Sequence, residues 1–222
     1  MIYKKWGVIF DLDGVLIDST NVMEIAFTYA FRHFFPTKMV PFEEYKTHMG
    51  KGFQKIMSEM NLPIEMHPLF KEKSTELASN IKVFEGAIET LNLLQEANCY
   101  IGLATGKDYA RTVQILEEKG MDKFFDKIVT SDMVENSKPH PESIEVHMEN
   151  SRLTANDFIF IGDSVSDIQC AKAASVRSIA VTWGMGQIDD LKNENPGHMV
   201  NDFLELKEVL ELIIQINHSN VS

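Results

Sequence analysis

Short apolar runs alternate with amphipathic stretches through most of the chain. The apolar runs predict strands at Gly7–Leu12, Tyr100–Ala104, Lys127–Thr130, Phe158–Ile161 and Ser178–Val181. Apolar residues at helical spacing predict helices at Ala87–Ala97, Ala110–Lys119 and Asp202–Ile216, with two more that begin near Pro141 and Ser166. Strands and helices in alternation predict an α/β fold whose core is a Rossmann-like parallel sheet with helices on both faces.

Residues 19–82 interrupt this alternation, because they contain only helical patterns. These patterns cover Val22–Phe35, Phe42–His48, Phe53–Met60 and Pro68–Asn80. A block of helices directly after the first strand predicts an inserted all-helical cap at 18–82, above the active edge of a core formed by residues 1–17 and 83–222. The alternative is a helical bundle packed on the side of the sheet.

The composition is that of a globular protein with a substantial core, since 44% of the 222 residues are hydrophobic and 24% are charged. A net charge of −12 and a pI near 5.0 argue against binding to nucleic acid or to an anionic membrane. An anionic substrate would therefore need local positive charge. We expect a monomer or a homodimer.

Cys99 and Cys170 lie in predicted strand and helix interiors, which favours buried free thiols in a reducing compartment. The sequence shows neither a basic leader followed by a long apolar run nor the roughly 20 apolar residues of a membrane span. We therefore expect a cytoplasmic protein.

Four polar segments follow predicted strands and would meet at one sheet edge if those strands are parallel. They are FDLDG with Asp11 and Asp13, LATGK with Thr105, Gly106 and Lys107, SKPHPE with Lys138, and IFIGDSVSD with Asp163 and Asp167. Each segment taken alone is an ordinary turn or surface loop. Their convergence predicts an active site.

Several carboxylates at one edge of an acidic protein repel one another, which a divalent cation relieves. Mg²⁺ prefers oxygen ligands and leaves room for a substrate phosphate, so we expect Asp11 and Asp163 to bind it. Residues Asp11 and Asp13 can face one reacting centre because they are two positions apart. One carboxylate can attack phosphorus, and the second, if it is protonated when substrate arrives, can donate a proton to the leaving oxygen.

Two further residues offer groups that bind a phosphoryl oxygen. Thr105 offers a hydroxyl, with a backbone N–H beside it at Gly106. Lys138 offers a fixed positive charge that orients Asp11 and offsets charge in the transition state.

Together these motifs resemble the haloacid dehalogenase superfamily, and the inserted helices resemble the type-one cap of its phosphoglycolate-phosphatase-like branch. The resemblance covers the chain and implies that Asp11 is the nucleophile and Asp13 the general acid and base. It implies that Thr105 and Lys138 hold the phosphoryl group and that Asp163 ligates Mg²⁺. It further implies that Asp13 lends its backbone carbonyl to the metal, and that Asp167 reaches the metal through water or braces Lys138.

Within that superfamily, the acid at Asp13 favours a phosphatase over the dehalogenases and phosphonatases, which lack an acid there. The hexose-phosphate mutases carry a histidine where this chain has Met23, which argues against a mutase. A phosphosugar mutase or other phosphotransferase stays open as an alternative. So does a non-catalytic binding protein that kept the fold.

Substrate choice is expected to depend on the cap segment around Gly50–Lys51–Gly52. Lys51 could bind a substrate carboxylate or a second phosphate, or it is a solvated loop residue, and His48 is a candidate hydrogen-bond partner. This segment also resembles the cap of phosphatases from aminohydroxybenzoate pathways. The resemblances imply a small phosphate monoester, of the phosphoglycolate, sugar phosphate or amino-sugar phosphate type.

Overall fold

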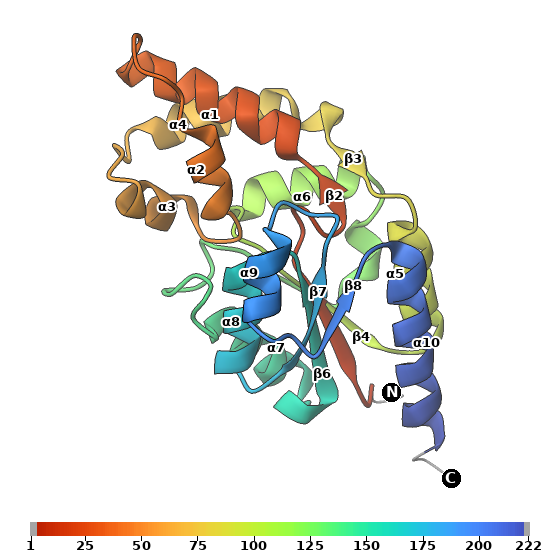
Figure 1. Cartoon of the computed structure of the whole chain (residues 1–222). Helices are drawn as coiled ribbons and strands as arrows, with labels where there is room; N and C mark the ends of the chain where they lie inside the picture. Colours follow the sequence, from red (N-terminus) through yellow and green to blue (C-terminus); the bar gives the residue numbers. More distant parts are fainter. Residues whose placement is uncertain (1–3, 220–222) are drawn as a thin grey trace.

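The computed structural model describes residues 4–219 and contains a six-stranded, fully parallel sheet (Figure 1). The strands lie in the order β5-β4-β1-β6-β7-β8. Their bounds are β5 Lys127–Val129, β4 Tyr100–Ala104, β1 Gly7–Phe10, β6 Phe158–Gly162, β7 Arg177–Val181 and β8 His198–Val200. The predicted α/β fold with a parallel sheet is confirmed.

Side chains of each strand alternate between two apolar layers, because successive residues of a strand point to opposite faces. In β1, Val8 and Phe10 belong to one buried cluster and Ile9 to another. The first cluster is covered by α5 (Ala87–Glu96), α6 (Tyr109–Glu118) and α10 (Phe203–Ser219). On the other face lie α7 (Glu142–Ser151), α8 (Val165–Ala173) and α9 (Ile188–Asn193). The core is therefore a three-layer sandwich.

The sequence analysis missed two elements near the end of the chain, β8 and α9. Strand β8 is three residues long and pairs only with β7, so it lies at the edge of the sheet. Helix α9 is six residues long and buries only Leu191. Both are too short to show the periodicity from which longer elements are predicted.

Four helices between β1 and α5 form an inserted cap, seen above the sheet in Figure 1. They are α1 (Thr20–Phe34), α2 (Phe42–Thr47), α3 (Phe53–Glu59) and α4 (Met66–Glu76), and a short 3₁₀ turn, Ala78–Asn80, follows α4. Aromatic and methionine side chains such as Phe27, Tyr45, Phe70 and Met57 fill a core of their own. The cap thus packs as a unit, and the domain boundaries at residues 18 and 82 stay a prediction.

Two short antiparallel strands connect the cap to the core. Strand β2 (Ile17–Asp18) pairs with β3 (Lys82–Val83), and Ile17 lies opposite Val83. Because the outgoing and returning chains are hydrogen-bonded there, the cap leaves the core through one narrow connection.

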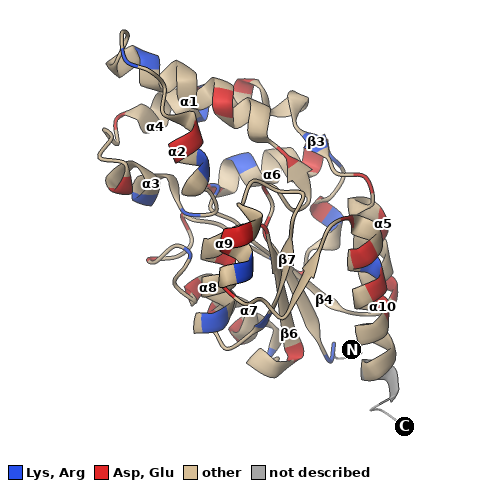
Figure 2. Cartoon of the chain, in the orientation of Figure 1, with Lys and Arg blue, Asp and Glu red and all other residues tan. Residues whose placement is uncertain are grey.

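The surface and the thiols add two observations on the setting of the protein. Figure 2 shows basic and acidic positions interspersed on the outer helices. Cys99 and Cys170 are both buried free cysteines, as predicted. Within residues 4–219, no helix combines the length and the hydrophobicity needed to cross a membrane.

Candidate active site

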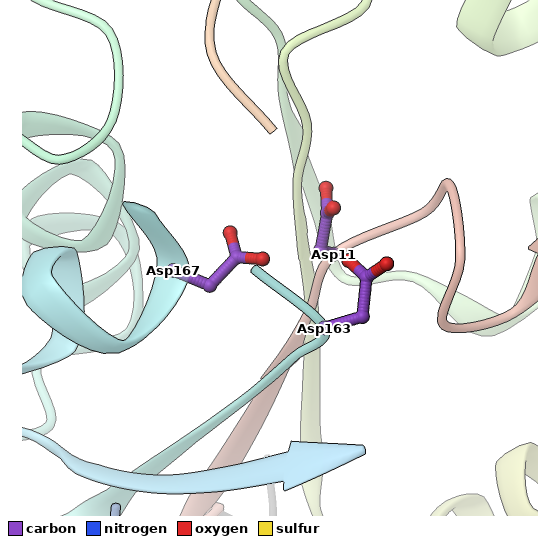
Figure 3. Close-up of side chains that lie close together, drawn as sticks. All are labelled: Asp11, Asp163 and Asp167. Carbon is purple, nitrogen blue, oxygen red and sulfur yellow. The ribbon is translucent and has the colours of Figure 1, made fainter. Parts of the chain in front are cut away.

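Three aspartates, two after adjacent strands and one in the helix that follows the second strand, approach one another at the carboxyl edge of the sheet (Figure 3). Asp11 follows β1, Asp163 follows β6, and Asp167 lies in the first turn of α8. One carboxylate oxygen of each lies within 4.8 Å of the others, and all three residues are buried. Parallel pairing of β1 with β6 brings these residues together, since it aligns the ends of the two strands.

Asp11 extends the sheet by one hydrogen bond, because its backbone N–H donates to the Ile161 carbonyl at 2.9 Å. Its side chain is almost fully buried, and one carboxylate oxygen lies 2.9 Å from the Lys138 ammonium. The pKa of Asp11 is raised to about 7, mainly by burial; Lys138 opposes this increase, and the charges of Asp167 and Asp13 contribute to it. Asp11 is thus a carboxylate whose ionised form depends on nearby positive charge.

Lys138 reaches this cluster from the loop before α7. Its ammonium lies 2.6 Å from Asp167 and donates a hydrogen bond of 3.1 Å to the Ala104 carbonyl at the end of β4. Burial alone would lower the pKa of Lys138, but the Asp11 and Asp167 carboxylates raise it well above its usual value. Lys138 is therefore a permanent cation inside the cluster.

Glycines surround the Asp163 carboxylate and leave it room. A side-chain carbon at Gly14, where φ is +79°, or at Gly184 would collide with the Asp163 carboxylate. The backbone N–H of Met185 donates to Asp163 Oδ2 at 2.7 Å. Burial, followed by the charges of Asp167 and Asp11, raises the pKa of Asp163 well above its usual value.

Asp167 is tied on both of its carboxylate oxygens. Oδ2 accepts hydrogen bonds from the Ser164 backbone N–H at 3.0 Å and from the Ser164 hydroxyl at 2.6 Å, in a capping box that begins α8. Oδ1 faces Lys138. Of the two roles expected for Asp167, these contacts match the bracing of Lys138.

The cluster fits a divalent cation. The cluster contains three buried carboxylates and one ammonium, so negative charge is in excess. Asp11 Oδ1 and Asp167 Oδ1 lie within ion-pair distance of Lys138, yet neither accepts a well-directed hydrogen bond from the described residues. Unsatisfied carboxylate oxygens are the ligands that hard divalent cations prefer.

Asp13 lies beside this cluster and has partners of its own. Lys107 Nζ lies 3.1 Å from Asp13 Oδ2, and the Ser19 hydroxyl donates to Asp13 Oδ1. These two contacts fix the position of the Asp13 carboxylate beside the cluster. The LATGK motif contained Lys107, but its sequence position does not show that it reaches Asp13.

Thr105 and Gly106 continue directly from β4. The Thr105 N–H donates to the Val129 carbonyl at 3.0 Å, and its hydroxyl accepts from the Lys107 N–H at 3.2 Å. A side-chain carbon at Gly106 would lie 2.5 Å from the Lys51 carbonyl oxygen of the cap. The cap loop therefore lies directly on the core at this glycine.

A cavity of about 40 Å³ lies between the cap and the two aspartates of the first motif. Asp11, Asp13 and Gly106 line it from the core, together with Lys107 and Arg111. From the cap come Met23, Tyr45, Met49, Gly50, Lys51, Phe53, Ile56 and Phe70. Sequence analysis missed Arg111 and Tyr45, because each is a single residue in a helix with no motif around it.

The two cap residues predicted to bind substrate both contact the carboxylate of Glu59. Lys51 Nζ lies 2.6 Å and His48 Nδ1 lies 2.7 Å from the same Glu59 carboxylate oxygen. Lys51 lines the cavity, whereas His48 is not among the lining residues. The structure thus brings Lys51, but not His48, to the edge of the site.

Comparison with known proteins gives consistent matches over most of the chain. The family described as haloacid dehalogenase-like hydrolase matches residues 8–181. The probable phosphatase IndB of Dickeya dadantii is 31% identical over 229 residues, which cover 97% of both chains. The pyrophosphatase PpaX of Listeria monocytogenes is 27% identical over 95% of this chain and 98% of its own. A solved structure described as a predicted phosphatase from Clostridium acetobutylicum is 27% identical, has a TM-score of 0.79 and covers 94% of this chain and 100% of its own.

Proposed function

The chain belongs to the family of haloacid dehalogenase-like hydrolases, and we propose that it is a Mg²⁺-dependent phosphatase acting on a small phosphate monoester. The observation that carries the proposal is the contact of buried Asp11 with Lys138, beside the carboxylates of Asp163 and Asp167. A nucleophilic carboxylate needs positive charge around it before an anionic phosphate can approach. The phosphatase names of the IndB and PpaX relatives support the same reaction class.

In the first step, an Asp11 carboxylate oxygen forms a bond to phosphorus while the ester P–O bond breaks. Asp13 donates a proton to the leaving oxygen, which departs as an alcohol. In the second step, Asp13 removes a proton from a water molecule, whose oxygen attacks the aspartyl-phosphate. Inorganic phosphate leaves, and Asp11 returns to its carboxylate form.

Other residues hold the reacting groups in place. Lys138 orients Asp11 and balances charge on the phosphoryl oxygens. The hydroxyl of Thr105 and the backbone N–H of Gly106 would bind phosphoryl oxygens. Mg²⁺, held by Asp11, Asp163 and the Asp13 carbonyl, with Asp167 reaching it through water or bracing Lys138, would neutralise phosphate charge.

We propose a phosphoglycolate, sugar phosphate or amino-sugar phosphate as substrate class, with Lys51 at the edge of the binding site. A phosphosugar mutase is disfavoured because Met23, where the mutases carry a histidine, lines the cavity and cannot transfer a proton. The two buried free thiols support a reducing, cytoplasmic setting.

The test is phosphate release from a panel of phosphorylated metabolites, with Mg²⁺ and with EDTA. We expect Asp11→Asn to abolish release, because an amide cannot attack phosphorus, and to leave the circular dichroism spectrum unchanged. Asp126→Asn, a substitution far from the cluster at the Lys4 ion pair, is the control. Phosphate release by Asp11→Asn at the wild-type rate would refute the proposal, and activity that survives full chelation would refute its metal requirement.

A further inference from the structure

Arg111 is held rigidly between the core and the cap. It lies in the first turn of α6, is 6% exposed, and its Nε donates to Asp108 Oδ2 at 2.6 Å. Its Nη1 donates to the Ser74 hydroxyl of α4 at 3.0 Å, and its guanidinium lies 5.3 Å from the Phe70 ring centre. A guanidinium has five N–H donors. Since Arg111 lines the cavity, it presents a fixed fork with donors left for a ligand.

The charge around Arg111 is not fully balanced. Asp108 contacts Arg111 and also lies 3.3 Å from the Lys71 ammonium, so one carboxylate serves two cations. The two other cations of the cavity wall, Lys51 and Lys107, each have a carboxylate partner within 3.1 Å. Asp108 therefore cannot neutralise both Arg111 and Lys71, and of these two cations Arg111 lines the cavity.

Tyr45 supplies a second donor to the same cavity. Tyr45 is 2% exposed, and its ring stacks on the Phe27 ring with the two ring centres 4.3 Å apart. Within residues 4–219, the Tyr45 hydroxyl has no hydrogen-bond partner. Burial raises the pKa of Tyr45, so it stays a neutral O–H donor. A ligand that accepts a hydrogen bond from this hydroxyl therefore gains a contact for which no protein group competes.

We propose that the substrate carries a second oxyanion, a carboxylate or a second phosphate, on its leaving group, and that Arg111 and Tyr45 bind it. The inference rests on the proposed phosphatase function and adds the chemistry of the leaving group. An oxyanion accepts hydrogen bonds only, which suits a wall that offers a phenol and a guanidinium.

The small cavity does not by itself limit the size of the leaving group. Its volume is about 40 Å³, but Phe53, Gly106 and Arg111 also line a second cavity of about 780 Å³. The experiment therefore starts from the smallest esters that carry a second oxyanion.

The experiment compares three phosphate monoesters of ethylene glycol size, assayed with the full chain and Mg²⁺. One carries a carboxylate (2-phosphoglycolate), one carries a second phosphate (ethylene glycol bisphosphate) and one is uncharged outside the phosphoryl group (2-hydroxyethyl phosphate). We expect the wild type to prefer at least one anionic ester to the neutral one by about 10-fold or more in kcat/KM. The anionic ester with the larger preference identifies the oxyanion.

Two conservative variants test the residues. Tyr45→Phe keeps the ring and removes the hydroxyl, and Arg111→Lys keeps the charge and removes the fork. Each is expected to reduce the preference for the anionic ester by about 10-fold, mainly through KM. Tyr29→Phe, in the exposed part of α1, and Arg177→Lys, at the exposed start of β7, are matched controls that leave the preference as it is.

The inference is overturned if the wild type shows no preference, or if Tyr45→Phe and Arg111→Lys lower kcat/KM for all three esters by the same factor. If none of the three is hydrolysed, their inhibition of aryl phosphate hydrolysis replaces the assay. Equal inhibition by charged and neutral esters overturns the inference, and tighter inhibition by a charged one supports it. Aryl phosphate hydrolysis by Asp11→Asn refutes the phosphatase proposal instead, so the two failures are distinguishable.

Discussion

The ammonium group of Lys138 lies 2.6 Å from Asp167 Oδ1, and the two side chains are 3% and 0% exposed. The other Asp167 oxygen is held by the Ser164 N-cap of α8. The first turn of α8 therefore sets the position of Lys138, which in turn lies 2.9 Å from Asp11. We therefore propose that Asp167 positions Asp11 through Lys138.

Asp167→Asn should destabilise the protein and reduce its activity. Removing one partner of a buried ion pair typically costs about 3–5 kcal/mol of unfolding free energy. We expect a loss in this range from urea denaturation at neutral pH, together with a lower kcat. Asp189→Asn removes the partner of Lys192 from a pair in which Asp189 is 94% exposed, and should change stability by less than about 0.5 kcal/mol. Equal stabilities of the two variants would contradict this reading of the buried pair.

Mg²⁺ should stabilise the folded protein through the three-aspartate cluster. At 100 times its dissociation constant, a ligand that binds only the folded state adds about 2.7 kcal/mol. We expect saturating Mg²⁺ to raise the melting temperature of the wild type and to have little effect on Asp163→Asn. Asp13→Asn should keep the increase, because its side chain faces Lys107 outside the cluster and its backbone carbonyl is intact. A Mg²⁺ response retained by Asp163→Asn would exclude Asp163 as a ligand.

His147 should make stability depend on pH between 4 and 6.5. Its Nε2 bonds the Leu103 carbonyl at 3.1 Å and therefore carries the proton, while Nδ1 accepts from the Tyr100 hydroxyl. Burial lowers the pKa of His147 from 6.5 to about 4. Between these values the unfolded chain binds more protons than the folded one, so stability falls as the pH falls.

The expected loss from this group is about 3 kcal/mol across that window, at 1.36 kcal/mol for each pKa unit. We expect His147→Gln to have a shallower dependence of unfolding free energy on pH, measured by urea denaturation at a series of pH values. The exposed His198 offers the matched control, His198→Gln. The same slope in both variants would show that other groups cause the pH dependence.

Gly14→Ala should disrupt the cluster more than its backbone conformation alone explains. Gly14 and Gly120 both have positive φ, +79° and +66°. A side-chain carbon at Gly14 would collide with the Asp163 carboxylate, whereas one at Gly120 would have nothing within 4 Å. Gly120→Ala should therefore cost about 1–2 kcal/mol from backbone strain alone. Gly14→Ala should cost more and also lose Mg²⁺ stabilisation, as measured by thermal unfolding. Equal losses in both variants would show that the Asp163 contact is unimportant.

The sequence by itself determined the strands, the longer helices and the polar residues at the strand ends. These features are local, because a buried strand needs a continuous apolar run and a ligand-binding edge begins where that run stops. The members of each aspartate pair, Asp11 with Asp13 and Asp163 with Asp167, are close in the sequence. Their proximity in space could therefore be predicted. Their catalytic and metal-binding roles stay predictions.

Tertiary structure alone decided which side chains pair around the cavity. The pairing of Lys107 with Asp13 joins a residue after β4 to one after β1, and it depends on these strands being neighbours in the sheet. Glu59 contacts both His48 and Lys51, and Arg111 donates a hydrogen bond to Ser74 of the cap. Such contacts depend on how the cap packs on the core, and no periodicity in the sequence encodes that packing.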